Sequence, residues 1–250
     1  MLLAIDIGNS SIKFGVFDGE TLLSKFSIPT SRGLTVDDLR FAIGRSLDLP
    51  ISSAIACSVV PDVNDRIQEF FQTSFQIDPF FITNDLDFGF EIIYFDPASL
   101  GTDRLVNTFA AAHKYGLPAI VCSFGTATTI DAINSESKFL GGLIAPGMQM
   151  MADALHHYTS KLPAVDVCQE SWVVTPSTED CIRAGVFYSQ QGLLEVAVRD
   201  IKKDIGDSPK VVATGGFASL IAENTGVIDV VDENLLLDGL RMLYSRKQTG

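Results

Sequence analysis

The chain has 250 residues and a mass of 27.0 kDa, and 46% of its residues are hydrophobic, so it can bury a large core and form one large domain or two moderate ones. Its formal net charge of -13 repels polyanions, which argues against general binding to nucleic acid or to an anionic membrane surface. Apolar stretches stay short of the ~20 residues that a membrane helix needs, and the start of the chain lacks a cationic leader, so we expect a cytoplasmic protein.

The N-terminal part of the chain is predicted to contain strands followed by alternating helices and strands. Apolar runs flank two tight turns, Gly8-Asn9-Ser10-Ser11 and Asp18-Gly19, which is typical of hairpins. Apolar residues at helical spacing follow Thr35, which suits an N-cap, and Pro61 opens a second helical pattern. The predicted order is strands at Leu2–Ile7, Ile12–Phe17 and Thr21–Ile28, a helix at Leu34–Leu47, a strand at Ser53–Val60 and a helix at Pro61–Phe75.

A later passage repeats this order around a second turn of small residues, 124–129. When the two turns are aligned, Gly8 falls on Gly125 and Asp6 falls on Ser123. The same alignment pairs Asn9 with Thr126 and Ser11 with Thr128. Because the pattern occurs twice, the chain is predicted to be internally duplicated. The predicted elements here are strands at Ala119–Ser123, Ile130–Ile133, Lys138–Ile144 and Lys210–Ala213 and, after Gly215-Gly216, a helix at Phe217–Ala222.

The boundary between the two halves is predicted near Tyr115, because Gly116 and Pro118 break a helix that begins around Arg104. The sequence thus predicts an α/β protein with one half at residues 1–116 and the other at 117–250. Ligands of open α/β sheets bind near the carboxyl ends of the strands. We therefore expect a cleft between the halves, with the site between the two glycine turns.

The first glycine turn suits the phosphates of a nucleotide. Backbone N–H groups and hydroxyls of residues 8–11 surround a concavity between two strands. Asp6 at the strand end can hold a magnesium ion through water, and Lys13 adds positive charge. A single glycine hairpin is more often only a hairpin, but its repetition at Gly125 favours the functional interpretation.

A second candidate is Gly101-Thr102-Asp103-Arg104, which precedes a predicted helix at Leu105–Tyr115. Thr102 or Asp103 could simply be the N-cap of this helix. In the functional interpretation, Asp103 accepts the proton of an attacking hydroxyl while Arg104 pairs with an anionic group of the substrate. Phosphoryl transfer depends mainly on positioning, so one base in line with the γ-phosphate can suffice.

The sulfur-containing side chains and the single tryptophan are assigned structural roles. The four cysteines, which include Cys168 and Cys181, lack metal-type spacing, and Cys57 and Cys122 lie in apolar runs, so we expect reduced, buried thiols. Trp172 is expected to pack rather than to stack on a ligand. A helix face or a subunit contact is expected to take the methionines that follow Pro146-Gly147, which are Met148, Met150 and Met151.

Five blocks together resemble the type III pantothenate kinases and span nearly the whole chain. They are Asp6-Ile7-Gly8-Asn9 with Lys13, Gly101-Thr102-Asp103-Arg104, Phe124-Gly125-Thr126-Ala127-Thr128-Thr129, Gly141-Gly142-Leu143-Ile144-Ala145-Pro146-Gly147, and Thr214-Gly215-Gly216. The resemblance implies a duplicated actin-like (ribonuclease H-like) fold and a homodimer. It also implies transfer of the γ-phosphate of ATP to the primary hydroxyl of pantothenate, which gives 4'-phosphopantothenate in the first step of coenzyme A biosynthesis. Mg²⁺ would accompany ATP, and the family also uses a monovalent cation, K⁺ or NH₄⁺.

The resemblance assigns roles to residues by position. Asp103 would be the catalytic proton acceptor, and Asp6 would hold Mg²⁺ through water. ATP would be bound by Asp6, Ile7, Gly8, Asn9, Ser10, Ser11, Ile12, Lys13 and Thr126. Pantothenate would be bound by Tyr94, Gly101, Thr102, Asp103, Arg104 and Thr178.

At one position the chain departs from the family's pattern. The family has an aspartate where this chain has Ser123, and a hydroxyl cannot supply the negative charge that would retain potassium or ammonium. Either the cation is bound more weakly, or other groups have taken over its role, or the activity is reduced. Two alternative functions stay open at this stage: a kinase-like binding or regulatory protein without efficient catalysis, and an actin-fold kinase for another small hydroxylated acid.

Overall fold

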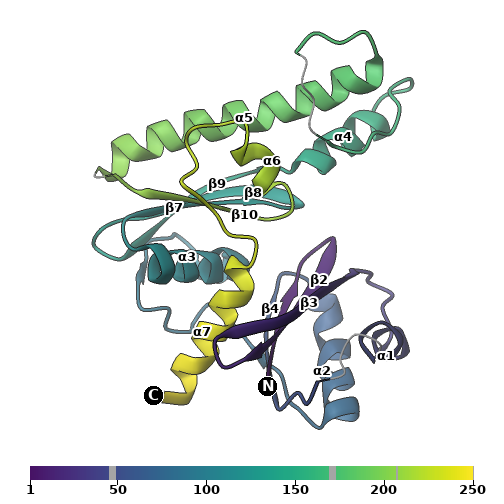
Figure 1. Ribbon diagram of the computed structural model, residues 1–250, viewed down its shortest axis with the longest axis vertical. Helices are drawn as coiled ribbons and strands as arrows, with labels where there is room; N and C mark the ends of the chain where they lie inside the picture. Colours follow the sequence, from purple (N-terminus) through teal and green to yellow (C-terminus); the bar gives the residue numbers. More distant parts are fainter. Residues whose placement is uncertain (45–48, 169–172, 207, 250) are drawn as a thin grey trace. The chain divides into compact units, whose positions relative to one another are not determined.

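The computed structural model describes residues 1–44, 49–168, 173–206 and 208–249 (Figure 1). The chain forms two compact units, each built from segments that are distant in sequence. The first unit comprises Met1–Phe88, Asp96–Ala110 and Asn234–Gly250, and the second comprises Gly89–Phe95 and Ala111–Glu233. The expected end of the first helix at Leu47 and the expected packing of Trp172 lie outside the described residues.

The first unit is built on a five-stranded sheet with the order β3-β2-β1-β4-β5. Its strands are β1 (Leu2–Ile7), β2 (Ser11–Asp18), β3 (Thr21–Pro29), β4 (Ser53–Ser58) and β5 (Phe80–Phe81). Strand β1 pairs antiparallel with β2 and parallel with β4. Because β1 is central, its apolar residues are buried without the strict alternation of a half-exposed strand.

Two helices of the first unit, α1 (Val36–Gly44) and α2 (Pro61–Phe75), start where the sequence predicts. The Asp38 N–H donates to the Thr35 hydroxyl at 3.2 Å, and the Thr35 N–H donates to Asp38 Oδ2 at 2.9 Å. This reciprocal pair confirms Thr35 as the N-cap of α1. Helix α2 contributes to the core through side chains at helical spacing, which are Val63, Ile67, Phe70 and Phe71.

The C-terminal helix α7 (Leu235–Thr249) belongs to the first unit, although it follows the whole second unit in sequence. It contacts strands β1, β2 and β4 and buries the leucines Leu235, Leu237, Leu240 and Leu243. The division also falls inside helix α3 (Thr102–Tyr115), between Ala110 and Ala111. These units therefore differ from the expected halves 1–116 and 117–250. The reason is that the apolar face of α7 is buried on a sheet formed by the other end of the chain.

The second unit is built on a six-stranded sheet with the order β11-β10-β7-β8-β9-β6. Its strands are β6 (Glu91–Ile92), β7 (Ala119–Phe124), β8 (Ala127–Ile133), β9 (Lys138–Pro146), β10 (Lys210–Thr214) and β11 (Val230–Val231). Strands β7, β8 and β9 form an antiparallel meander, and β10 is parallel to β7. The same arrangement relates β1, β2 and β3 to β4, which confirms the predicted duplication.

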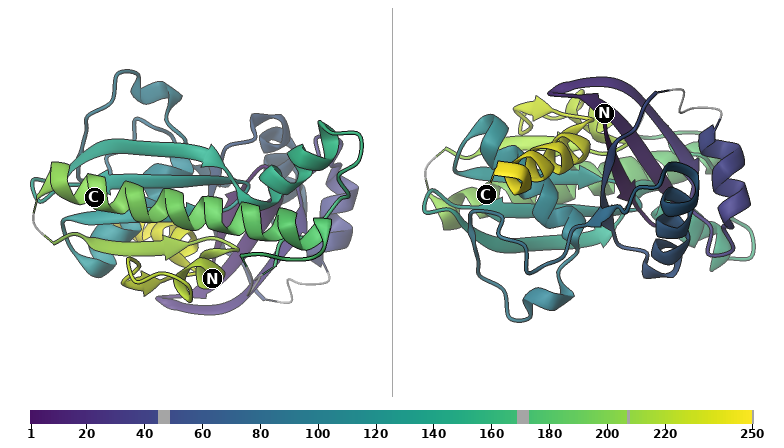
Figure 2. Two further views of the ribbon diagram at one scale, coloured as in Figure 1. Left: turned by 90° about the horizontal axis from the view of Figure 1, so that it is seen from above. Right: turned by 90° about the horizontal axis from the view of Figure 1, so that it is seen from below.

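Helices α4 (Met148–His157), α5 (Thr178–Ile205) and α6 (Ala218–Ala222) pack against the second sheet. Figure 2 shows the long helix α5 running across one face of this sheet. The sequence patterns predicted neither α5 nor α7. A local signal for the start of α5 does exist, because the Ser177 hydroxyl accepts from the Asp180 N–H at 3.1 Å as an N-cap.

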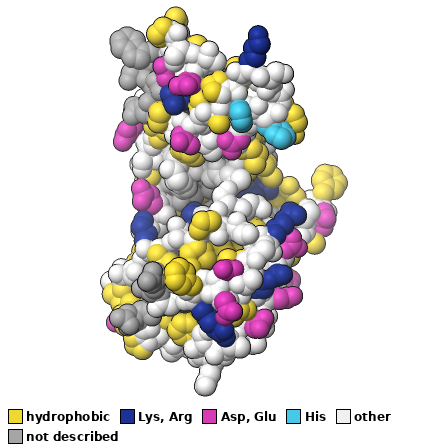
Figure 3. Space-filling view, turned by 90° about the vertical axis from the view of Figure 1, so that its right-hand side faces the viewer, with side chains coloured by type: hydrophobic (Ala, Val, Ile, Leu, Met, Phe, Trp, Pro, Cys, Tyr) yellow, Lys and Arg dark blue, Asp and Glu magenta, His cyan; other side chains and the backbone are white. Residues whose placement is uncertain are grey.

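The cysteines divide into two classes. Cys57 and Cys122 are buried in strands, as expected, but Cys168 and Cys181 are exposed, so the expectation of burial is wrong for these two. The expectation of burial rested on the apolar runs around Cys57 and Cys122, and Cys168 and Cys181 lie outside such runs. Within the described ranges, no helix combines the length and the apolar character that crossing a membrane requires. Figure 3 shows basic and acidic side chains interspersed over one face of the molecule.

Candidate functional site

The first glycine turn joins β1 to β2 and is held from two directions. The Gly8 N–H donates to the Ser11 carbonyl oxygen at 3.1 Å, which closes the turn. From the loop after β3, the Thr30 hydroxyl donates to the Gly8 carbonyl oxygen at 2.6 Å. Asn9 and Ser10 are exposed at the tip. The turn therefore has a fixed backbone and presents small polar groups to solvent.

Asp6 and Lys13 stand opposite each other on β1 and β2. Lys13 Nζ lies 3.7 Å from Asp6 Oδ2, and the aspartate side chain is 13% exposed against 49% for the lysine. Burial raises the pKa of Asp6 to about 6, because the ionised carboxylate loses hydration; Lys13 lowers this pKa and the Asp103 carboxylate raises it. A buried carboxylate with a second one nearby fits a divalent cation, which would offset their repulsion.

The start of helix α3 is fastened to the end of strand β4 by Thr102. The Thr102 hydroxyl oxygen lies 3.2 Å from Cys57 Sγ and 3.3 Å from the Ser58 carbonyl oxygen. Burial raises the pKa of the Cys57 thiol well above its usual range, so the thiol stays protonated and donates to Thr102, which donates to Ser58. Thr102 is therefore an anchor to the sheet and not the N-cap of α3, because the helix already begins at this residue.

Asp103 follows this anchor in the first turn of α3 and lies near Asp6. Burial raises the pKa of Asp103, while the backbone N–H and the guanidinium of Arg104 lower it in part. A carboxylate with a raised pKa is suited to accept a proton from a hydroxyl. Gly101 makes room for it, because a Cβ at this position would collide with Asp103 Oδ1. Arg104 is only 5% exposed, so the side chain that the sequence assigns to an anionic group of the substrate is largely buried.

A groove of about 890 Å³ with both polar and apolar side chains in its lining opens beside the start of α3. The end of β4, the start of α2, the loop after β5 and the 3-10 turn η1 (Pro97–Ser99) line it. Asn84 stabilises this wall, since its Nδ2 donates to the carbonyl oxygens of Pro97 at 2.8 Å and of Leu100 at 2.7 Å. Gly101 and Thr102 also line the groove, so it can admit a small molecule beside these two residues.

The second glycine turn, between β7 and β8, is one residue shorter than the first. The Gly125 N–H donates to the Ala127 carbonyl oxygen at 3.1 Å, two residues on, whereas the equivalent bond of Gly8 spans three. Thr129 therefore stands opposite Ser123 as Lys13 stands opposite Asp6. The alignment of Ser11 with Thr128 is thus wrong by one residue. The acid and lysine of the first turn are replaced by two hydroxyls in the second.

Three glycine segments predicted from the sequence meet around the second turn. The Gly147 N–H donates to the Thr126 carbonyl oxygen at 3.0 Å, and a Cβ at Gly147 would collide with the backbone of Gly125 and Thr126. Gly215 has a φ of +97°, and a Cβ there would lie 2.5 Å from the Phe124 carbonyl oxygen. Glycine is therefore required at both positions, because backbones approach too closely for any side chain.

Gln190 of α5 is a residue of this region that the sequence patterns did not indicate. Its Oε1 accepts from the buried Thr128 hydroxyl at 2.7 Å, and its Nε2 donates to the Pro146 carbonyl oxygen at 2.9 Å. Gln190 is itself 2% exposed. A buried amide that joins β8 to the end of β9 holds the second turn in shape. No motif marks it, because its partners lie more than forty residues away.

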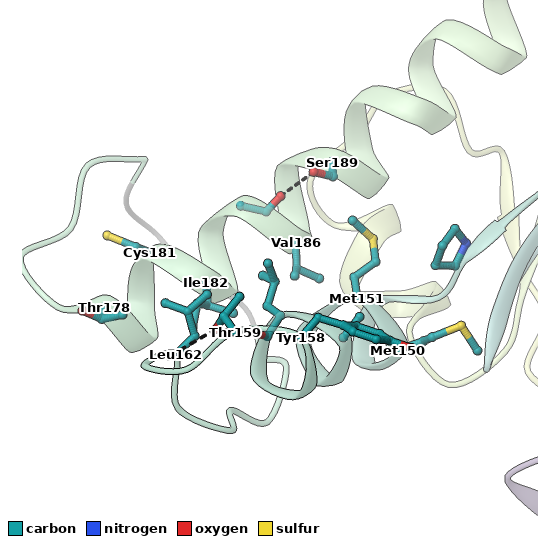
Figure 4. A pocket seen from close by; sticks show the side chains of 14 residues that line it. Met150, Met151, Tyr158, Thr159, Leu162, Thr178, Cys181, Ile182, Val186 and Ser189 are labelled. Carbon is teal, nitrogen blue, oxygen red and sulfur yellow. Dashed lines mark hydrogen bonds between the residues drawn. The ribbon is translucent and has the colours of Figure 1, made fainter.

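The other predicted residues of the second unit occupy separate places. Tyr94 is 38% exposed and lies over β9, where a Cβ at Gly141 would be 3.2 Å from its ring. Thr178 is the exposed first residue of α5. It lies at an apolar groove of about 910 Å³ between α4 and α5. Figure 4 shows Val186 of α5 and Met151 of α4 facing each other in this groove.

The structure thus gathers the predicted residues into groups within each unit. In the first unit it brings together Asp6, Lys13 and the segment 101–104. In the second unit Thr126 contacts Gly147, whereas Tyr94 and Thr178 lie on other elements. The chemistry available in the first group is cation binding by one carboxylate and proton acceptance by another.

Comparison with known proteins gives a consistent result along the whole chain. A profile of the family described as type III pantothenate kinase matches residues 2–200. A type III pantothenate kinase from Geobacter sulfurreducens is 37% identical over 255 residues, which cover 99% of this chain and 100% of that protein.

Solved structures agree with the fold. A protein described as a Baf family transcriptional activator from Campylobacter jejuni has a TM-score of 0.62 at 22% identity and covers 99% of this chain and 100% of its own. A protein described as an N-acetylmannosamine kinase from Listeria monocytogenes has a TM-score of 0.55 at 11% identity, with 99% of each chain covered. At these identities the two structures show the fold alone, which is the expected duplicated actin-like α/β fold.

The raised pKa of Asp6 predicts how stability depends on pH in the absence of nucleotide and Mg²⁺. The folded state holds this proton more tightly than the unfolded chain does, so the resulting stability is full below the unfolded pKa of 3.8 and is lost as pH rises through about 6. Asp6→Asn cannot ionise. We expect its free energy of unfolding, relative to wild type, to increase by on the order of 1–3 kcal/mol between about pH 4 and 7.5 in urea titrations.

The matched control for this experiment is Asp37→Asn, because the Asp37 side chain is 87% exposed. Its stability relative to wild type should change much less over the same pH interval. Parallel stability curves for Asp6→Asn and wild type would contradict the burial of an ionisable carboxylate at this position.

Proposed function

The chain belongs to the type III pantothenate kinase family, and we propose from its structure how its own residues carry out the family's reaction. It phosphorylates pantothenate with ATP, the first step of coenzyme A biosynthesis. The near-complete coverage of curated pantothenate kinases does not favour a binding protein without catalysis or a kinase for another acid. The geometry of the first glycine turn and of the start of helix α3 supports a role for each of several residues.

Asp103 is the proton acceptor. The observation that supports this most strongly is the anchoring of Thr102 to Cys57 and Ser58, which holds Asp103 near Asp6. As the primary hydroxyl of pantothenate attacks the γ-phosphate, its proton passes to the Asp103 carboxylate. Burial raises the pKa of Asp103, which strengthens its carboxylate as a general base for this proton.

For ATP we propose the first glycine turn, residues Asp6 to Lys13, and the resemblance to the family adds Thr126 as a further contact. The closed turn offers N–H groups and hydroxyls, and the Lys13 ammonium offers positive charge for phosphate oxygens. The largely buried Asp6 carboxylate fits Mg²⁺ held through water. When bound, the ion supplies positive charge that neutralises the phosphates.

Pantothenate is bound by Gly101 to Arg104, with Tyr94 and Thr178 as further contacts. The guanidinium of Arg104 suits the carboxylate of pantothenate, and the neighbouring groove suits a small polar molecule. Tyr94 is sufficiently exposed to offer its hydroxyl to a ligand, as is Thr178 at the start of α5.

At the position of the family's monovalent-cation ligand, this chain lacks a negatively charged side chain. At the expected position the structure places Ser123 opposite Thr129, and these two side chains provide hydroxyls without negative charge. Hard cations are held mainly by carboxylate and carbonyl oxygens. We therefore assign no step to potassium or ammonium and propose that the enzyme works with little dependence on either.

The apolar groove between α4 and α5 supports the expected homodimer. Met150, Leu155 and Tyr158 of this region are 43%, 38% and 82% exposed, respectively. Contiguous apolar side chains on a surface favour association with a second protein surface. A second copy of this chain would bury them, and the expectation that the methionines reach a subunit contact then applies to Met150. We also propose a cytoplasmic location for the enzyme.

Asp103→Asn should remove turnover and preserve the fold. We expect kcat for pantothenate phosphorylation to fall by roughly 10²–10⁴-fold, since an amide cannot accept the proton. ADP release with Mg-ATP measures it, and circular dichroism verifies folding. The exposed Asp65→Asn on α2 is the control. Wild-type turnover in Asp103→Asn would show that this residue is not the proton acceptor. A panel of small hydroxylated acids in the same assay tests which substrate the enzyme uses.

Ser123→Asp should create a dependence on potassium that the wild type lacks. At constant ionic strength, replacing choline by K⁺ should change the wild-type rate by no more than about twofold, whereas the carboxylate of the variant should give clear activation. Thr129→Val serves as a control, because it removes a hydroxyl without adding charge. Strong potassium activation of the wild type would show that other groups hold the cation.

Leu155→Glu should convert the dimer to a monomer. A charge in the groove between α4 and α5 cannot be buried without a large cost, so association should weaken by at least about tenfold in Kd. Sedimentation equilibrium measures this. Leu23→Glu, at a leucine of β3 that is 46% exposed, is the control and should leave the association unchanged. A dimer of equal strength in both variants would place the contact elsewhere.

A further inference from the structure

Helix α7 approaches helix α3 at Gly239 so closely that no side chain fits. A Cβ at Gly239 would lie 2.9 Å from Val106 Cγ1, 2.9 Å from the Val106 carbonyl oxygen and 3.0 Å from Ala110 Cβ. The backbone of Gly239 is helical and no positive φ is involved, so the contact alone requires glycine. Figure 1 shows the two helices next to each other at this point.

Helix α7 is also held in place by contacts with other elements, and these contacts oppose its movement away from α3. Leu237 packs against Gly15 of β2, where a Cβ would lie 3.1 Å from Leu237 Cδ1. Near its C-terminal end, Arg246 pairs with Asp87 at 2.7 Å, and the Lys247 ammonium lies 3.3 Å from the centre of the Phe80 ring. Because these contacts oppose a retreat of α7, we expect an added methyl group at Gly239 to push on α3.

A displacement of α3 acts directly on the candidate base, because Asp103 is in the same helix and only three residues before Val106. The Thr102 contacts fasten the start of the helix to the sheet, and of these the 3.3 Å contact with the Ser58 carbonyl oxygen is long for a hydrogen bond of a hydroxyl. They can yield when the helix is pushed. Catalysis is sensitive to such shifts, since misplacement by about 1 Å can cost roughly 100-fold in rate.

From these contacts we infer that Gly239 is a positioning residue for the reaction: its lack of a side chain lets α7 set the place of α3 and thereby of Asp103. This inference rests on the proposed role of Asp103. It assigns to the C-terminal helix a part in phosphoryl transfer, although no residue of that helix needs to touch a substrate.

Gly239→Ala tests the inference with a matched control. Gly192→Ala in α5 makes the same substitution in a helix, but its Cβ meets nothing within 4 Å. Alanine favours a helix over glycine at both positions, so a loss in only one cannot come from helix propensity. For Gly239→Ala we expect kcat to fall by about tenfold or more, with the KM for ATP changed by less than about twofold. Gly192→Ala should keep the wild-type kcat.

A second variant distinguishes the displacement of α3 from general damage to the packing of α3 and α7. In Gly239→Ala/Val106→Ala one of the clashing groups, Val106 Cγ1, is removed, so kcat should recover in part. Unchanged kcat in Gly239→Ala would overturn the inference. So would a loss of kcat that the double variant does not relieve, or one that comes with an equal rise in the KM for ATP, since either indicates general damage to the fold.

Asp103→Asn, assayed alongside, separates this inference from the proposed function. If Asp103→Asn loses turnover while Gly239→Ala keeps it, only the positioning role of Gly239 fails. If Asp103→Asn keeps turnover, the proposed catalytic role fails, and with it the premise for Gly239.

Discussion

The candidate site depends on how the start of helix α3 is fastened to strand β4. Thr102 makes this connection through the Cys57 thiol and the Ser58 carbonyl oxygen. The connection holds Asp103 close enough to Asp6 for its charge to raise the pKa of Asp6, and burial raises the pKa of both carboxyl groups. Two buried carboxylates repel, and the Lys13 ammonium offsets only part of the cost. Such a pair is suited to a cation and to a proton, which are what a kinase must handle.

The second unit repeats the fold of the first but lacks the charged side chains at its glycine turn. Its glycine turn has the same place in the meander as the first, yet Ser123 and Thr129 stand where the first turn has an acid and a lysine. What holds this turn is close backbone contact at Gly147 and Gly215, together with the Gln190 amide. Duplication has thus preserved the backbone while the side chains have diverged, so that only the first turn presents charged groups.

Local patterns predicted those elements whose residues carry their own signal. Strand β1 at Leu2–Ile7 and helix α2 at Pro61–Phe75 have the predicted bounds, because an apolar run between turns and a proline-initiated apolar stripe are local features. Helix α5 was missed although it is 28 residues long and its buried positions recur at helical spacing, because its buried face includes the polar Gln190 while the apolar Tyr188 and Val196 are exposed. The exposure of Cys181 was likewise missed, because burial of a single residue depends on what packs over it.

The sequence by itself determined which chemical groups are present and in which blocks, and that sufficed to recognise the family and the duplicated fold. Only the tertiary structure decided that Thr102 is an anchor, that the second turn is one residue shorter than the first, and that α7 lies with the first unit and meets α3 at Gly239. The physical reason is the same in each case. These features arise from contacts between segments that are distant in the chain. Whether two such segments fit together depends on how both of them pack, and the sequence pattern of either segment alone does not contain this information.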